Sequence, residues 1–197
     1  MKIGITGGIG SGKSYVARRV EARGFEVYDC DKAAKRLIAT SPDIRHQLTA
    51  LIGPDAYIEE TAARNPDGSS LLNKKAVAQF LLASEENAQA IDAIVHPAVF
   101  QDFRQSGLLW MESAILFESG AYRLVDCTIA VSCPLEERIR RVMLRDGISR
   151  EKVLQWIDRQ LQQDEVIRRA DFEIINDGIA DIEKQLNTIL RQCNRQF

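Results

Sequence analysis

The chain has 197 residues, of which 45% are hydrophobic, and its formal net charge is −2. This size and apolar content suffice for one domain with a large core, and the near-neutral charge argues against partners such as nucleic acid or an anionic membrane surface. The cysteines (Cys30, Cys127, Cys133 and Cys193) form no C-x-x-C pair, and no apolar run is as long as a membrane span. We expect a soluble, cytoplasmic protein with reduced thiols.

The first expected element is an apolar strand over residues 2–6, followed directly by a glycine-rich segment. Residues 7–14 match G-x-x-x-x-G-K-[ST] at every fixed position. Glycines let several backbone N–H groups converge on a phosphate, Lys13 adds a cation, and the Ser14 hydroxyl can ligate Mg²⁺. A turn that binds nothing is the alternative, but the preceding strand and the helical pattern over residues 15–23 favour a phosphate-binding loop.

The second strand is expected over residues 25–28, and Asp29-Cys30-Asp31 follows it. Ligands bind at the carboxyl edge of a parallel sheet, where an acid can accept a hydroxyl proton or orient a phosphoryl acceptor. Asp31 is also a natural N-cap for a helix predicted over residues 32–39. Both roles can hold for this pair of acids.

Between about residues 32 and 107 the pattern is helical and interrupts the alternation of strands and helices. Helices are predicted over residues 32–39, 42–51, 73–83 and 85–105, with a turn cluster at 65–70. His96 precedes Pro97 in the last of these segments. A lone histidine there is typical of a structural residue, although the cis or trans state of Pro97 could shape a pocket.

Further strands are predicted over residues 108–114, 126–132 and 172–176, which implies a parallel sheet with right-handed crossovers. Glu112 lies near the carboxyl end of the first of these strands. It can hold the Mg²⁺ shell, or it can be a partly exposed strand-end residue. Glu118 could line the site of the phosphoryl acceptor.

A second helical block over residues 134–169 carries Arg138, Arg141 and Arg145 along one side of a helix. Guanidinium groups bind phosphoryl oxygens in a forked geometry, whereas a solvated face paired with nearby acids is the alternative. After a phosphate loop, phosphate binding is favoured. An amphipathic helix is predicted over about residues 179–192. Two helical segments around such a core favour a small-molecule kinase, whose reaction needs a second pocket and a cover that excludes water.

Taken together, the motifs resemble those of the dephospho-coenzyme A kinase family over nearly the whole chain. The matching segments are residues 5–14, Asp29-x-Asp31 with Ala33, His96-Pro97, residues 116–120, residues 141–147, Gln160, Ala170-Asp171 and Asn176-Asp177-Gly178. The resemblance implies a single P-loop kinase domain over residues 1–197, an α/β three-layer sandwich with a parallel five-stranded sheet of order 2-3-1-4-5. The implied core comprises residues 1–31, 108–133 and 170–197, with a coenzyme-binding helical insertion at about 32–107 and a lid at about 134–169.

The resemblance also implies a reaction and its residues. The reaction is ATP-dependent phosphorylation of the ribose 3′-hydroxyl of dephospho-coenzyme A, with Mg²⁺. The implied catalytic residues are Asp31, Lys13 and Arg141. Mg²⁺ would be held by Ser14 and Glu112, and the acceptor by Asp31, His96, Leu116 and Glu118. ATP would be held by Gly8, Ile9, Gly10, Ser11, Gly12, Lys13, Ser14, Tyr15, Arg141, Arg145, Asn176 and Gly178.

The chain departs from the usual pattern of the family at Glu112, commonly Asp, at Ala114, usually Pro, and at Arg138, often Gln. Another nucleotide or small-metabolite kinase would share the loop and the lid, and a nucleotide-dependent switch would share the loop. The lid arginines and Asp31 favour a kinase over a switch, and no N-K-x-D pattern indicates guanine binding. The expected partners are the two substrates, and the chain could be a monomer or a small homo-oligomer.

Overall fold

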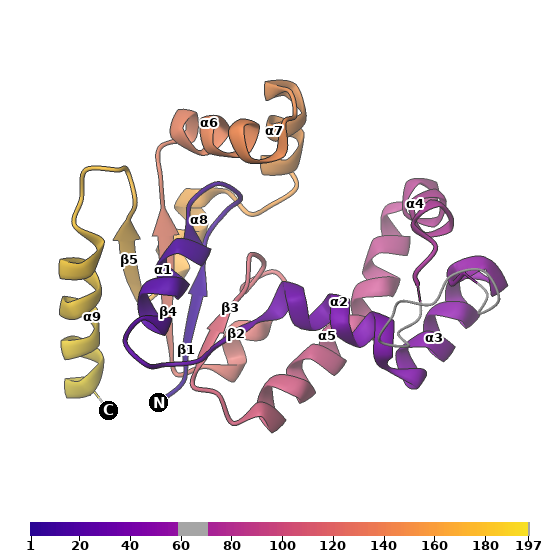
Figure 1. Ribbon diagram of the computed structural model, residues 1–197, viewed down its shortest axis with the longest axis horizontal. Coiled ribbons are helices and arrows are strands. Elements are labelled where there is room, and N and C mark those ends of the chain that lie inside the picture. Colours follow the sequence, from indigo (N-terminus) through magenta and orange to yellow (C-terminus); the bar gives the residue numbers. More distant parts are fainter. Residues whose placement is uncertain (59–70, 197) are drawn as a thin grey trace. The chain divides into compact units, whose positions relative to one another are not determined.

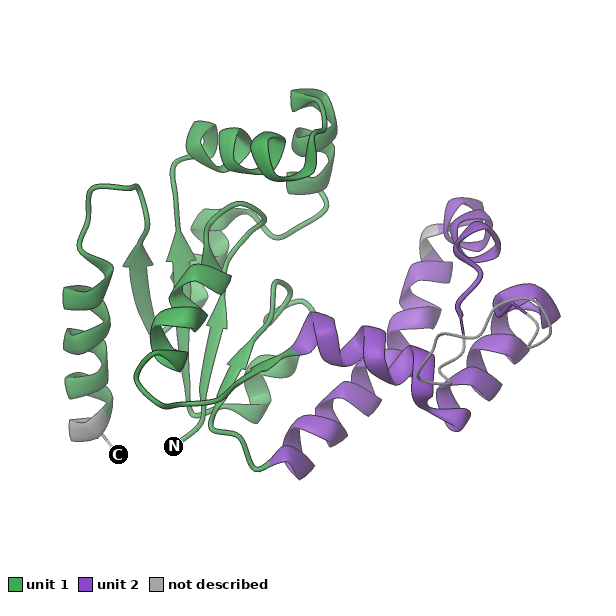
Figure 2. Cartoon of the chain, in the orientation of Figure 1, with its two compact units in different colours: residues 1–29, 107–197 green, residues 30–106 purple. Residues whose placement is uncertain are grey.

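The computed structural model describes residues 1–58 and 71–196 and shows an α/β fold (Figure 1). The chain divides into two compact units. Unit 1 comprises residues 1–29 and 107–197, and unit 2 comprises residues 30–106 (Figure 2). The turn cluster predicted at residues 65–70 lies outside the described residues. None of the helices in the described part combines the length and the apolar character that crossing a membrane requires.

Unit 1 contains a parallel sheet whose described strands follow the order β2-β3-β1-β4-β5, which confirms the predicted fold class. These strands are β1 (Ile3–Thr6), β2 (Val27–Asp29), β3 (Trp110–Glu112), β4 (Cys127–Ser132) and β5 (Phe172–Ile175). Its helices are α1 (Lys13–Glu21), α6 (Leu135–Asp146), α7 (Arg150–Ile157), α8 (Gln163–Arg169) and α9 (Ile182–Gln196), with a 3₁₀ turn η2 (Ala121–Leu124).

Helices cover both faces of this sheet, which is why every residue of β1 and β4 is buried. On one face, Val20 of α1 and Leu186 of α9 belong to the same core cluster as Ile129 of β4. The next residue, Ala130, points to the opposite face because successive side chains of a strand alternate. There it packs with Val166 of α8. The result is the three-layer arrangement that we predicted.

The helical block predicted over residues 134–169 consists of three helices with different packing partners. Buried residues of α6 and α7, including Ile139 and Val153, form a small cluster of their own, against which Ile9 of the phosphate loop packs. By contrast, α8 packs on the sheet. Helices α6 and α7 are therefore attached to the phosphate loop, and α8 is part of the core layers.

Unit 2 is helical, as predicted for the insertion. It contains α2 (Cys30–Thr40), α3 (Pro42–Ile52), a 3₁₀ turn η1 (Pro54–Ala56), α4 (Lys74–Ala83) and α5 (Glu85–Ser106). Ser41 caps α3 by accepting a hydrogen bond from the Ile44 backbone N–H at 3.3 Å. Ile44 is buried in the core of this unit with Leu48 and Tyr57, whose hydroxyl donates to the Ile38 carbonyl oxygen at 3.0 Å.

Several predicted boundaries were wrong for identifiable reasons. Helix α2 begins at Cys30, immediately after β2, so Asp31 lies in its first turn and is not the N-cap. Pro97, whose cis or trans state we considered, lies inside α5, and the described residues contain no cis peptide bond. Helix α9 begins at Ile182 and not at residue 179, because Asp181 caps it by accepting a hydrogen bond from the Lys184 backbone N–H at 3.0 Å.

Candidate active site

The phosphate loop joins β1 to α1 and is enclosed so closely that side chains are excluded at key positions. Gly12 has φ 92°, and a Cβ atom there would lie 2.0 Å from Asn176 Nδ2. Gly10 has φ 79°, and its Cβ would lie 2.5 Å from the carbonyl oxygen of Arg138 in α6. Both positions therefore require glycine for backbone conformation and for space.

Gly10→Ala is expected to lower the free energy of unfolding by about 2–4 kcal/mol and to abolish ATP binding, because it combines left-handed strain with overlap against backbone. Gly147→Ala is the matched control, since Gly147 has φ 65° but nothing within 4 Å of its Cβ position. In the control, the free energy of unfolding should fall by only about 1–2 kcal/mol. Urea unfolding and ATP titration measure both effects, and equal losses in the two variants would contradict the predicted crowding.

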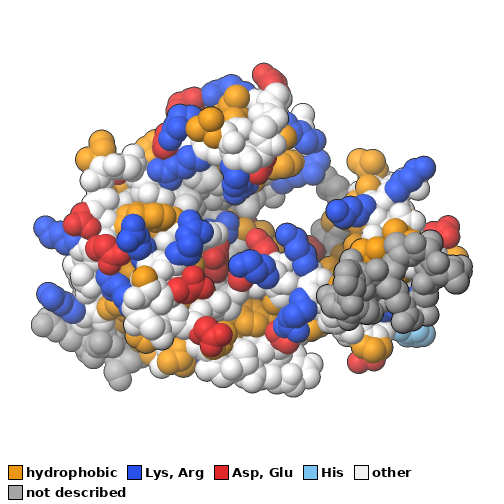
Figure 3. Space-filling view, in the orientation of Figure 1, with side chains coloured by type: hydrophobic (Ala, Val, Ile, Leu, Met, Phe, Trp, Pro, Cys, Tyr) orange, Lys and Arg blue, Asp and Glu red, His pale blue; other side chains and the backbone are white. Residues whose placement is uncertain are grey.

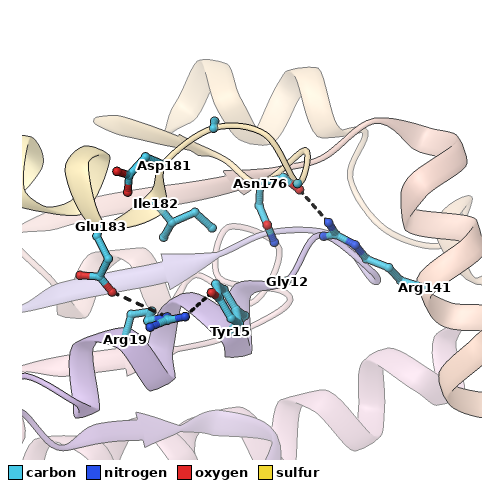
Figure 4. Close-up of a pocket in the computed structure, with 10 residues that line it drawn as sticks. Gly12, Tyr15, Arg19, Arg141, Asn176, Asp181, Ile182 and Glu183 are labelled. Carbon is cyan, nitrogen blue, oxygen red and sulfur yellow. Dashed lines mark hydrogen bonds and ion pairs between the residues drawn. The ribbon is translucent and has the colours of Figure 1, made fainter.

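Side chains from distant segments hold the loop and form the pocket beside it. Asn176 Nδ2 donates to the Ser11 carbonyl oxygen at 2.7 Å, and the guanidinium of Arg141 donates from one terminal nitrogen to the Asn176 carbonyl oxygen at 3.1 Å (Figure 4). The pocket measures about 600 Å³, and Gly12, Tyr15, Arg141, Asn176 and Gly178 are among its lining residues. The structure thus brings together five of the residues predicted to bind ATP.

A second pocket, of about 370 Å³, adjoins the first and shares Gly12, Tyr15 and Arg141 with it. Lys13, Arg18 and Arg145 also line it, so that four cations and the N-terminus of α1 surround one space. The Lys13 side chain has no hydrogen bond or ion pair within the described part of the chain. Permanent cations and unpaired helix N–H groups are what a chain of phosphates binds.

The orientation of Arg141 is fixed by Glu137, one turn earlier on α6. Arg141 Nε donates to Glu137 Oε1 at 2.8 Å, and Arg140 binds the same carboxylate at 2.7 Å. The hydrogen bonds from Arg140 and then Arg141 lower the pKa of Glu137 to about 2, so its charge persists at neutral pH. Figure 3 shows Lys and Arg side chains over α6 and α7 with acidic side chains among them. Part of the solvated-face alternative is therefore correct, since Arg145 is exposed and paired with Asp146 at 2.7 Å.

The outer part of the larger pocket contains residues that the sequence analysis missed. The Arg19 guanidinium lies 4.7 Å from the centroid of the Tyr15 ring and donates to the Tyr15 hydroxyl (Figure 4). Glu183 of α9 approaches Arg19 at 3.6 Å and Arg23 at 2.6 Å. The i, i+4 spacing of Tyr15 and Arg19 could have indicated their contact. No local pattern indicated Glu183, which the fold brings from the other end of the chain.

The predicted metal ligands are in direct contact. Ser14 Oγ donates to Glu112 Oε1 at 2.5 Å, and Glu112 is only 8% exposed, so it is not the partly exposed strand-end residue of the alternative interpretation. Hydroxyl and carboxylate oxygens are ligands that suit Mg²⁺. The described residues contain no group of three or more His, Cys, Asp or Glu side chains that could hold a metal ion. A cation at Ser14 and Glu112 would therefore share its shell with water and substrate phosphates, as Mg²⁺ commonly does.

The four residues predicted on the acceptor side are divided between the units. Asp31 is exposed and His96 is half-buried, and both lie in unit 2. His96 Nε2 is 3.5 Å from Asp92 Oδ1 one turn away, which supports the structural interpretation of this histidine. In unit 1, the Leu116 side chain is 0% exposed and belongs to the core, which contradicts its prediction as a substrate contact. The Glu118 carboxylate accepts a hydrogen bond from the Leu161 backbone N–H at 3.1 Å.

Ile9 connects the phosphate loop to the helices that follow β4. Its backbone N–H donates to Gln160 Oε1 at 2.8 Å, and its carbonyl oxygen accepts from Arg138 Nε at 3.0 Å. Gln160 was part of the family resemblance without an assigned role, and Arg138 was grouped with Arg141 and Arg145, for which phosphate binding was favoured and a solvated face was the alternative. In the structure Arg138 is buried instead, because α6 turns this residue toward the loop together with Ile139 and Val142.

A phosphate loop on the central strand of a parallel 2-3-1-4-5 sheet, with arginines of α6 beside it, defines a P-loop kinase. A model of the dephospho-CoA kinase family matches residues 1–181. The chain is 42% identical over 185 residues to a dephospho-CoA kinase of Bacteroides fragilis, covering 90% of this chain and 85% of that relative. The chain belongs to the dephospho-CoA kinase family.

Solved structures agree with the fold. A crystal structure of a Thermus thermophilus protein superposes with a TM-score of 0.80 at 34% identity and covers 98% of this chain and 97% of its own. Dephospho-CoA kinase from Campylobacter jejuni superposes with a TM-score of 0.62 at 20% identity and covers 100% and 99% of the two chains. At 20% identity, the similarity to the Campylobacter jejuni structure shows the fold alone.

Proposed function

We propose that this protein transfers the γ-phosphoryl group of ATP to the ribose 3′-hydroxyl of dephospho-CoA and releases CoA and ADP. The observation that carries the proposal is the convergence of Lys13, Arg141 and Arg145 on one pocket at the phosphate loop. The adjoining pocket between α1 and the segment before α9 has the size expected for the rest of the nucleotide. Membership of the dephospho-CoA kinase family supports the choice of acceptor.

In this reaction a bond forms between the 3′-oxygen and the γ-phosphorus, and the bond from that phosphorus to the bridging oxygen of ADP breaks. Lys13, Arg141 and the loop N–H groups would stabilise charge on the phosphoryl oxygens. Asp31 would orient the hydroxyl and receive its proton. Bound Mg²⁺, held by Ser14 and Glu112, would neutralise negative charge on the phosphates.

The test is to incubate the purified protein with ATP and Mg²⁺ and, separately, dephospho-CoA, adenosine, AMP or shikimate. Products are identified by mass. We expect a product 80 mass units heavier only from dephospho-CoA, because one PO₃H unit is added. Product from AMP alone, or from none of the acceptors, would refute the proposal.

Glu112→Gln is expected to raise the Mg²⁺ concentration needed for half-maximal activity by about tenfold, because it removes an anionic ligand and leaves the side chain its size. Glu173→Gln is the matched control, since Glu173 accepts a hydrogen bond from the Ser132 hydroxyl in a similar pair on β4 and β5. The measurement is initial rate against Mg²⁺ concentration at saturating ATP. An unchanged Mg²⁺ dependence in Glu112→Gln would remove Glu112 from the metal site.

A further inference from the structure

Arg138 differs in its surroundings from the other arginines of α6. The other three, Arg140, Arg141 and Arg145, each form an ion pair with an acidic neighbour on the helix. Arg138 is only 5% exposed, and within the described part of the chain it has no ion pair. Its one hydrogen bond there runs from Nε to the Ile9 carbonyl oxygen at 3.0 Å. A buried charge without a counter-charge is costly, so this position calls for an anion.

The guanidinium of Arg138 lies against the backbone of the phosphate loop. A Cβ atom on Gly8 would be 2.3 Å from one terminal nitrogen of Arg138 and 3.0 Å from Cζ. Burial lowers the pKa of Arg138 from its usual value, but an arginine remains protonated at neutral pH. The positive charge therefore lies directly beside the Gly8-Ile9 segment.

The terminal nitrogens of Arg138 are not completely enclosed by the described residues. In the described residues, the one fully enclosed side-chain nitrogen or oxygen atom without a partner is Ser11 Oγ. The terminal nitrogens of Arg138 also have no partner there, so they are not fully enclosed. A mostly buried cation without a counter-charge in the described residues thus lies against the Gly8-Ile9 segment of the phosphate loop.

We propose that Arg138 is a phosphate-binding residue, whose terminal nitrogens donate hydrogen bonds to the phosphoryl oxygens of the nucleotide in the loop. This inference rests on the proposed function. A bound phosphate supplies the missing counter-charge, and the low dielectric of a buried site strengthens the interaction. Removing the charge should consequently leave the stability of the free protein unchanged or raise it, and should lower its affinity for the nucleotide. Loss of a side chain with only a structural role would instead lower the stability of the free protein.

The test compares Arg138→Gln with the parent protein. Gln keeps an N–H donor for the Ile9 carbonyl oxygen but carries no charge. Titration calorimetry is performed with ATP and with inorganic tripolyphosphate, and melting is measured without ligand. We expect affinity for both anions to fall at least tenfold and the melting temperature of the free protein to stay equal or rise. Arg150→Gln is the control, because Arg150 is an exposed arginine of α7 paired with Glu136 at 2.6 Å. Its affinities should stay within twofold of the parent.

Parent-like affinity of Arg138→Gln for ATP or for tripolyphosphate would overturn the inference. If that variant does not fold, Arg138→Lys decides, because it keeps the charge and loses the planar fork. A fall of at least threefold in affinity for both anions, at an unchanged melting temperature of the free protein, supports phosphate binding by the terminal nitrogens. Unchanged affinity for both anions overturns it. The two proposals fail separately. A parent protein that binds ATP but makes no CoA refutes the proposed function, whereas an active parent with a tight-binding Arg138→Gln refutes only this inference.

Discussion

Lys13→Ala is expected to reduce turnover by about a hundredfold or more and to leave folding intact. Lys13 lines the smaller pocket, and its side chain has no hydrogen bond or ion pair within the described residues, so its loss removes no such contact of the free protein. In the reaction its charge stabilises the transferred phosphoryl group, and loss of one such group costs on the order of 3 kcal/mol in the transition state.

The measurement is kcat with saturating ATP and dephospho-CoA, together with a melting curve. Lys152→Ala is the matched control, because Lys152 is an exposed lysine of α7. The control should retain parent activity and melting temperature. Normal turnover in a folded Lys13→Ala protein would show that the loop lysine does not take part in transfer.

Asp31→Asn is expected to slow phosphoryl transfer by about a hundredfold to ten-thousandfold while ATP binding changes little. The lower end is favoured, because phosphoryl transfer passes through a loose transition state in which the proton leaves late. Asp31 lies in the first turn of α2, where loss of its charge should cost the helix only about 0.3–1 kcal/mol. Instability therefore does not explain a large kinetic loss.

Single-turnover kinetics with saturating dephospho-CoA measure the effect, alongside ATP titration and melting. Asp43→Asn is a close control, because Asp43 is an exposed acid in the first turn of α3 in the same unit. Asp43→Asn should lower the melting temperature as much as Asp31→Asn does, and it should leave the rate of phosphoryl transfer unchanged. Full activity in Asp31→Asn would move the acceptor-side role to Asp29, which pairs with Glu112 in register, or to Glu118.

The parts of the site that could be predicted are those whose chemistry depends on residues close together in the sequence. The glycine spacing of residues 7–14 specifies the loop, and Lys13 and Ser14 follow from it. Glu112 was predicted because it ends an apolar strand, and its contact with Ser14 agrees with that hypothesis. The strand alternation predicted a parallel sheet, whereas the strand order depended on the family resemblance.

The parts that could not be predicted depend on tertiary packing. Spacing places Arg138 and Arg141 on one side of a helix, but how far α6 is rotated toward the loop decides which of them is buried. Nothing in the sequence around Leu116 distinguishes a core residue from a substrate contact. Asp177 and Asp181 are both suitable helix caps by residue type, and in the structure it is Asp181 that caps α9, by accepting a hydrogen bond from the Lys184 backbone N–H.

The three contacts of Ile9 limit how helix α6 can move. To lift away from the loop, α6 must break the hydrogen bonds of Arg138 to Ile9 and of Arg141 to Asn176, and part of the Ile9 side chain must become exposed. If Gln160, which follows α7, moves as well, its bond to Ile9 is also lost. Such losses cost about 2–4 kcal/mol. At tenfold per 1.4 kcal/mol, about one molecule in 30 to one in 1,000 would be detached at any moment. The loop is therefore held in one shape in the free protein, and detaching α6 from it costs free energy before any nucleotide binds.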